Sequence, residues 1–269
     1  MAVPLFIFAA TVCRFIGDLR WDPKKRLAII LEHQTVSQAS KLDRTYLPIL
    51  DQLFIDQDEA EKERLAREFR EVVGTIVMLA IPLSVISLSS LLSIPEDEIA
   101  CRLDLLHSVL SIPVDRATPV RLLHLSFRDF LLDPQKCRKS PFWVDERDVH
   151  KRLANGCLKL LSTSKHLKRD ICNLQRPGTR RSKIDSKVIE RSLPPDVQYA
   201  CRYWVYHLEQ SKTQIYNGDQ AHAFLCKRLL YWLEALSLMG YTAESISMIE
   251  VLQSLLEVRL IDINIAVLY

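Results

Sequence analysis

Apolar residues recur at helical spacing along most of the 269-residue chain. This spacing is typical of amphipathic helices that bury one face, and only six glycines interrupt it. It predicts a mainly α fold built of helical bundle segments. Two of the stripes contain tryptophans, which we expect in a helical core. They are Val197, Ala200, Cys201, Trp204, Val205 and Leu208 in one stripe, and Leu225, Leu229, Trp232, Leu233 and Leu236 in the other.

The helical period changes in one region of the chain. Two short helices are expected over 87–92 and 96–110, the second with a stripe that runs to Leu110. A small β-hairpin follows them, with arms at 111–114 and 119–124 and a four-residue turn between the arms. A proline in each arm is typical of short edge strands. Two helices followed by a hairpin predict a winged-helix module.

Two apolar segments resemble a secretory signal and a membrane span. The first, 1–18, has no basic residue before its apolar run and carries Arg14 within it. The second, 72–95, is interrupted by Pro82 and five serines, so two buried helices divided at 81–84 are the better interpretation. Seven scattered cysteines without a Cys-x-x-Cys pair favour reduced thiols. We therefore expect a cytoplasmic chain with no membrane span.

Charge is distributed unevenly along the chain. The second helix of the winged-helix module, 96–110, has four acidic residues and one arginine, a net charge of −3, whereas contact with DNA phosphates needs lysine and arginine. Nucleic-acid binding by that helix is therefore not expected. Residues 164–191 hold nine lysines or arginines and three acidic residues, a net charge of +6. An exposed loop is the favoured interpretation of this segment, and a nucleic-acid or lipid patch is the alternative.

Motifs that mark an active site are missing from this sequence. None of the six glycines is followed by Lys and Ser or Thr, so there is no Walker A loop to hold phosphates. The seven histidines form no His-x-x-x-His pair, and there is no Gly-x-Ser-x-Gly motif. The sequence therefore predicts neither an independent enzyme nor a metal site.

Four segments resemble one family. "PLFIFAATVCRFI", "LLHLSFRDFLLD", "VQYACRYWVYHLEQS" and "FLCKRLLYWLEALSLMG" follow one another as in fungal NACHT-type STAND proteins, the vegetative-incompatibility class of NOD-like receptors. They resemble the region after the nucleotide-binding core, which is a P-loop ATPase. The resemblance implies a remnant of the first helical domain at 1–56, a winged-helix domain at 57–138 and a second helical domain at 139–269.

The resemblance also implies two residues that contact ADP. In the family, a histidine at the position of His124 contacts the β-phosphate, and a proline at the position of Pro4 lies beside the adenine, although Val3 replaces the usual preceding glycine. We expect Ser126 to cap the helix after His124, with Asp129 in its first turn. A purely structural histidine at a strand end is the alternative to the sensing role.

The function implied by the resemblance is regulatory. Its protein partner would be a P-loop NACHT core, and the chain would change conformation with the nucleotide state of that core. Without the core, the chain would bind neither ADP nor ATP. The alternative is an independent helical module that binds proteins or nucleic acids through 164–191.

Overall fold

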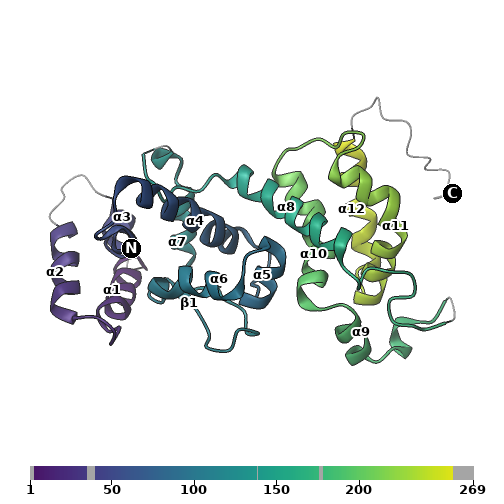
Figure 1. The fold of residues 1–269 in the computed structure, drawn as a ribbon, viewed down its shortest axis with the longest axis horizontal. Coiled ribbons are helices and arrows are strands. Elements are labelled where there is room, and N and C mark those ends of the chain that lie inside the picture. Colours follow the sequence, from purple (N-terminus) through teal and green to yellow (C-terminus); the bar gives the residue numbers. More distant parts are fainter. Residues whose placement is uncertain (1–2, 35–39, 138, 176–177, 257–269) are drawn as a thin grey trace. The chain divides into compact units, whose positions relative to one another are not determined.

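The structure, a computed structural model, describes residues 3–34, 40–137, 139–175 and 178–256, with side chains from residue 6 onward (Figure 1). This part of the chain is mainly α-helical and contains a single two-stranded antiparallel hairpin, as the sequence predicts. None of its helices is both long and apolar enough to cross a membrane. The chain divides into two compact units, residues 1–86 with 94–146, and residues 87–93 with 147–269.

The first three helices of the first unit pack against one another. The described elements of this unit are α1 (Val3–Ile16), α2 (Pro23–Gln34), α3 (Lys41–Leu50), η1 (Asp51–Phe54), α4 (Glu59–Met78), α6 (Glu96–Leu103), η2 (Asp104–Leu106), β1 (Leu110–Ser111), β2 (Arg121–Leu122), α7 (Leu125–Leu132) and η3 (Pro134–Lys136). In Figure 1, α1, α2 and α3 lie together, and each contacts the other two. Helix α3 also contacts α7, where the Tyr46 ring packs 5.1 Å from Phe127 and 5.2 Å from Phe130 between centroids.

The apolar segment 72–95 forms two helices rather than one. Helix α4 starts at an Asp58 cap, whose side chain accepts a hydrogen bond from the Glu61 N–H, and ends at Met78. Helix α5 (Val85–Leu92) begins after Pro82, which has no N–H to continue a helix. The predicted division at 81–84 is confirmed.

The two strands of the hairpin are shorter than the sequence predicts. Strand β1 pairs Leu110 with Leu122 and Ser111 with Arg121, so the arms are two residues long and the loop between them is wider than four residues. The prolines that follow β1 and precede β2 lack the N–H that a longer ladder needs. The segment after α4 supports the second arm, since the Val120 N–H donates to the Leu83 carbonyl at 2.9 Å.

The second helix of this region also ends earlier than predicted. Helix α6 stops at Leu103, the 3-10 turn η2 follows, and Leu110 lies in β1. Leu106 and Leu110 are both fully buried, as their place in the apolar stripe predicts. Because periodic burial continues through the turn and into the strand, the stripe is longer than the helix.

Tryptophans form the core of the second unit. Its described elements are α8 (Glu146–Thr163), η4 (Arg181–Lys183), α9 (Ser186–Ser192), α10 (Pro195–Gln210), α11 (Gln220–Met239) and α12 (Thr242–Leu255). The first residue of α8, Glu146, is counted with the first unit. Trp204 on α10 and Trp232 on α11 have no exposed surface, and their rings pack edge to face with centroids 5.4 Å apart. The Trp232 indole N–H donates to the Cys201 carbonyl at 2.8 Å. The prediction that both tryptophans are buried is confirmed.

Residues 87–93, most of α5, belong to this second unit although their neighbours on both sides belong to the first. Gly156 on α8 lets α5 approach closely, because a Cβ atom at this position would lie 2.7 Å from the Leu91 carbonyl oxygen. The Lys159 ammonium donates to Ser93 Oγ at 3.2 Å on the same side of α8. Helix α5 is therefore held by a contact that only glycine permits at that position.

Candidate functional site

His124 is the N-cap of helix α7. Its backbone is extended, and its Nδ1 accepts a hydrogen bond from the Ser126 N–H at 3.0 Å. The expectation that Ser126 caps this helix is therefore wrong: the helix begins at Leu125, and the imidazole nitrogen takes the role that a serine or aspartate oxygen usually has. No simple sequence signal predicts this cap, because histidine is not among the preferred N-cap residues.

A buried tyrosine fixes the orientation of the His124 ring. Tyr46 Oη lies 2.7 Å from Ser126 Oγ, which lies 2.8 Å from His124 Nδ1. Burial raises the pKa of Tyr46, so its phenol is neutral and can donate to Ser126. Because Nδ1 accepts in this network, the neutral ring carries its proton on Nε2, as assigned from the hydrogen bonds. His124 itself is exposed, and Nε2 has no hydrogen-bond partner within the described residues.

A cavity of about 220 Å³ lies beside His124, and we call it the His124 cavity. One face of α1 forms one wall, and the opposite wall comes from α3, α7 and the residues next to the hairpin strands. The lining residues are Phe6, Ile7, Ala10, Thr11 and Arg14 on α1, with Tyr46, Ser108, Val109, Leu123, His124 and Phe127 opposite.

Both residues implied by the family resemblance belong to elements that border this cavity. His124 lines it directly. Pro4 lies in the first turn of α1, and its side chain falls outside the described residues. The structure thus brings the helix of Pro4 and the imidazole of His124 to one cavity, although 119 residues separate them in the sequence. Tyr46, which positions the His124 ring through Ser126, is not among the residues that the sequence predicts for this site.

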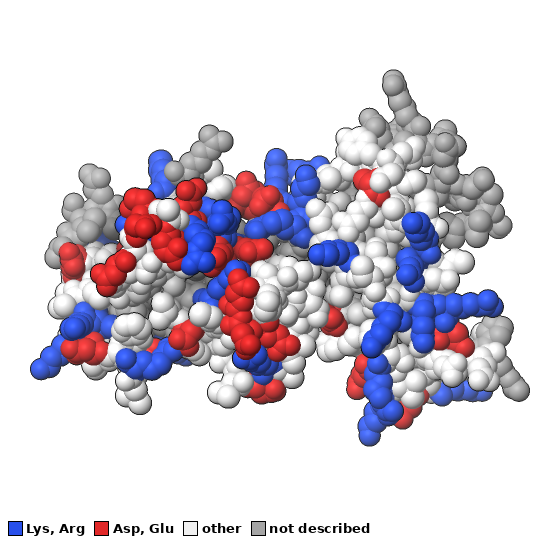
Figure 2. Space-filling view, viewed as in Figure 1, with Lys and Arg blue, Asp and Glu red and all other residues white. Residues whose placement is uncertain are grey.

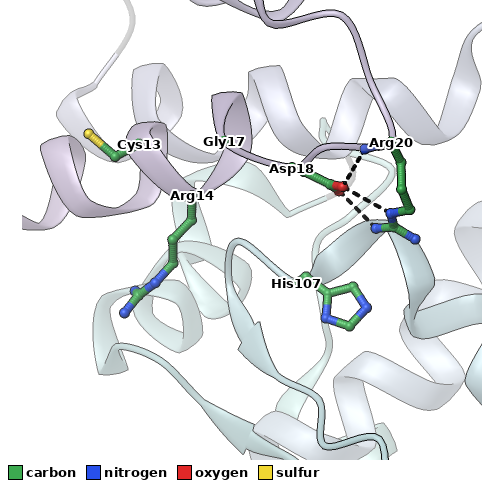
Figure 3. A pocket seen from close by; sticks show the side chains of 6 residues that line it. All are labelled: Cys13, Arg14, Gly17, Asp18, Arg20 and His107. Atoms are coloured by element: carbon green, nitrogen blue, oxygen red, sulfur yellow. Dashed lines mark hydrogen bonds and ion pairs between the residues drawn. The ribbon is translucent and has the colours of Figure 1, made fainter.

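A second, more open hollow lies near the C-terminal end of α1 (Figure 3). It is lined by Cys13, Arg14, Gly17, Asp18, Arg20 and His107. The Arg20 guanidinium donates to Asp18 at 2.8 and 2.9 Å and to Asp104 at 2.6 Å. Its hydrogen bonds lower the pKa of Asp18 to about 2. Arg20 therefore joins the end of α1 to the end of α6, and its charge is already balanced by two carboxylates.

Basic residues of 164–191 lie on the surface of the second unit. Figure 2 shows lysine and arginine side chains gathered where Figure 1 places α9 and the segment before it. The segment is anchored through Leu167, which is fully buried, and through the Arg181 guanidinium, which donates to the Leu238 carbonyl at 2.8 Å. The exposed basic residues are Lys165, Lys168, Arg169, Arg180, Arg181, Lys183, Lys187 and Arg191. This agrees with an exposed segment.

Within the described ranges, no group of three or more His, Cys, Asp or Glu side chains is placed to hold a metal ion.

Cys157 and Cys201 are buried, and burial raises the pKa of both thiols, so neither is a reactive thiolate.

Comparison with known proteins links the chain to fungal incompatibility proteins. It is similar to the vegetative incompatibility protein HET-E-1 of Podospora anserina. The two are 28% identical over 274 aligned positions, which cover 93% of this chain. The alignment covers 19% of HET-E-1, so the chain spans about a fifth of the length of that relative. No family model matches the chain, and no solved structure matches it. The similarity to HET-E-1 agrees with the class that the four sequence segments resemble.

Proposed function

We propose that this chain is a regulatory segment of a NACHT-type STAND protein, in which a winged-helix domain senses the nucleotide held by a P-loop ATPase core. In this proposal His124 donates a hydrogen bond to the β-phosphate of ADP and thereby favours the inactive state. The chain supplies no catalytic residue. The observation that carries the proposal is the His124 cavity, where an oriented imidazole and the helix of Pro4 meet.

The chemistry of His124 suits a phosphate. Its Nε2 is a donor in the neutral ring, because Nδ1 is occupied as the cap of α7. The N-terminus of a helix also favours a negative charge, since its first N–H groups have no partner within the helix. Loss of a phosphate oxygen from this position would remove a charge-assisted hydrogen bond, which is how a change of nucleotide would be registered.

The size of the cavity supports a shared site. Pockets that hold a whole small ligand usually measure about 300–1,000 Å³, whereas the His124 cavity measures about 220 Å³. It has room for part of a nucleotide. This fits an arrangement in which a P-loop core holds the rest, and it agrees with the absence of a Walker A motif from this sequence.

ADP release tests the proposal. The chain would be fused to the P-loop core of a NACHT-type protein, and the rate of release of fluorescent ADP would be measured for the parent and for His124→Asn. Asparagine is a good N-cap residue, so this change removes the Nε2 donor and keeps helix α7 capped. A lost charge-assisted hydrogen bond of about 1.5–3 kcal/mol corresponds to release that is roughly 10-fold to 100-fold faster.

His107→Asn is the matched control, because His107 is an exposed histidine of the same unit that does not line the His124 cavity. It should leave ADP release unchanged. Equal release rates for the parent and a folded His124→Asn protein would show that the histidine is structural.

A second candidate function rests on the exposed basic residues of 164–191. Here the chain would act as an independent helical module that binds protein or nucleic acid. Fluorescence anisotropy with duplex DNA at low and moderate salt tests the nucleic-acid form, because phosphate contacts weaken steeply with salt. Under this candidate, Arg180→Glu with Lys183→Glu abolishes binding, whereas under the regulatory proposal the parent protein shows none above the background of a neutral control protein.

A further inference from the structure

Ser108 is a buried polar residue whose hydroxyl forms no hydrogen bond with the described part of the chain. It lies between η2 and β1, lines the His124 cavity and is 5% exposed. Its Oγ has no hydrogen-bond partner among the described residues. Buried hydroxyls are nearly always hydrogen-bonded, because water no longer solvates them. An unpartnered hydroxyl on a cavity wall therefore points to a ligand atom that completes it.

Arg14 is the cationic group of the same cavity. It lies in the last turn of α1 and lines both the His124 cavity and the hollow of Figure 3, in which its side chain extends on the side of α1 where His107 lies. Two neighbouring arginines already have partners within the fold. Arg20 forms ion pairs with Asp18 and Asp104, and Arg26 donates a hydrogen bond to the Phe15 carbonyl. Within the described part of the chain, Arg14 makes no ion pair or hydrogen bond.

On the face of α1 that lines the cavity, the aromatic residue and the cationic residue lie far apart. Phe6 and Ile7 line it from the start of α1, and Arg14 lines it from the end of that helix. Arg14 lies eight positions after Phe6, which corresponds to a rise of about 12 Å along the helix. An occupant that satisfies both ends has a flat apolar part and an anionic part.

We propose that Arg14 and Ser108, together with His124, form a phosphate-binding subsite that takes the pyrophosphate end of a nucleotide. Guanidinium groups bind phosphate oxygens through paired hydrogen bonds, and the serine hydroxyl and the imidazole Nε2–H add single donors. The proposal deepens the regulatory function, on which it rests, by assigning two further contacts to the same ligand. It places the phosphates toward the C-terminal end of α1 and the base toward Phe6 and Pro4.

Titration of the whole chain with inorganic pyrophosphate tests the subsite without any ATPase core. The side-chain signals of Arg14 Nε and His124 would be followed by ¹⁵N NMR. Both should shift together and saturate in the millimolar range, because a subsite without a P-loop binds weakly. Arg14→Gln should abolish the saturable shift of His124, and Ser108→Ala should weaken binding several-fold while the chain stays folded.

Lys24→Gln is the matched control, since it removes one positive charge from the exposed surface of α2 in the same unit. It should leave the pyrophosphate titration unchanged. Equal effects of Lys24→Gln and Arg14→Gln, or shifts that never saturate, would overturn the subsite and indicate a general response to salt.

The two proposals can fail separately. Saturable pyrophosphate binding that depends on Arg14, with ADP release from the fusion unaffected by His124→Asn, would keep the subsite and reject the sensing function. Faster ADP release from the His124→Asn fusion, with neither pyrophosphate binding nor ADP release affected by Arg14→Gln, would keep the sensing function and reject the subsite.

Discussion

His150 and His207 form a hydrogen-bonded pair in the core of the second unit, with their Nδ1 atoms 2.8 Å apart. His207 Nε2 lies 2.7 Å from Tyr199 Oη, so one chain of hydrogen bonds links the three side chains. Both histidines are fully buried. Burial, with a smaller contribution from His150, lowers the pKa of His207 to about 3. The ring is therefore neutral in the native state at physiological pH.

This pair makes the stability of the chain sensitive to acid. In the unfolded chain His207 binds a proton below its ordinary pKa of about 6.5, whereas in the folded chain it stays neutral down to about pH 3. The unfolded state thus holds more protons between these values, and the free energy of unfolding falls by up to about 1.4 kcal/mol for each pH unit below about 6.5. Urea melts at a series of pH values measure this slope.

His207→Gln is the variant to compare, because glutamine keeps a hydrogen-bonding side chain and cannot titrate. Its stability should be lower at neutral pH and should decline less steeply on acidification. An identical slope in the parent and the variant would contradict the assignment to His207.

Trp232→Ala should destabilise the second unit by about 3–5 kcal/mol, as large-to-small core substitutions do. The change leaves a cavity beside Trp204 and removes the donor to the Cys201 carbonyl. Trp204→Ala should cost a similar amount. Thermal melts followed by circular dichroism measure both, with Trp21→Ala as the control because Trp21 is 48% exposed. A Trp232→Ala chain that melts together with the control would place this residue outside the core.

Phe127→Ala should destabilise the first unit by about 3–5 kcal/mol without any nucleotide present. Phe127 is 1% exposed, and its ring packs against Tyr46. Because Tyr46 positions Ser126, the loss of this packing should also release the His124 ring. Denaturant melts monitored by tryptophan fluorescence and by His124 NMR signals measure the two effects, and a stable variant with an unchanged His124 signal would argue against the link.

His124→Ala should cost about 1 kcal/mol, which is the usual effect of losing an N-cap side chain. His124→Asn should stay close to the parent because asparagine also caps. Denaturant melts of the two variants distinguish a capping role from a deeper structural one. A loss of several kcal/mol in both variants would show that the ring contributes far more to folding than its hydrogen bond to Ser126 explains.

The chain on its own should bind ADP and ATP only weakly. Most phosphate affinity in nucleotide sites of this kind comes from the N–H groups of a P-loop and the adjacent helix N-terminus, and no Walker A motif is present in this sequence. Isothermal titration calorimetry should detect no binding in the micromolar range. Micromolar ADP binding would mean that the chain holds a complete nucleotide site.

Helices were predictable because periodic burial follows local sequence. Apolar spacing predicts the buried stripes that contain Trp204 and Trp232, and Pro82 with the serines around it predicts the break after α4. The same method placed Leu110 in a helix, since a buried residue in a strand can fall on the helical period by chance. Periodicity reports which residues are buried, and pairing with Leu122 decides the backbone conformation.

Only part of the site was predictable. His124 could be identified from the family resemblance, but its capping role depends on Ser126, and the position of Ser126 depends on Tyr46, 80 residues earlier. Ser108 is buried, and it lines the same cavity as Arg14 although 93 residues separate the two in the sequence. Long-range contacts of this kind leave no local pattern in a single sequence.

The assignment of residues 87–93 to the second unit affects how this chain can be divided or exchanged. A fragment that begins at residue 147 lacks Leu88 and Leu91, which are buried, and with them the backbone of helix α5 that packs against Gly156. Recombination with a related gene anywhere between residues 94 and 146 would combine α5 from one parent with α8 from the other. In such a hybrid the parent that supplies α8 must keep a glycine at the position of Gly156, because any larger residue there would collide with the α5 backbone of the other parent.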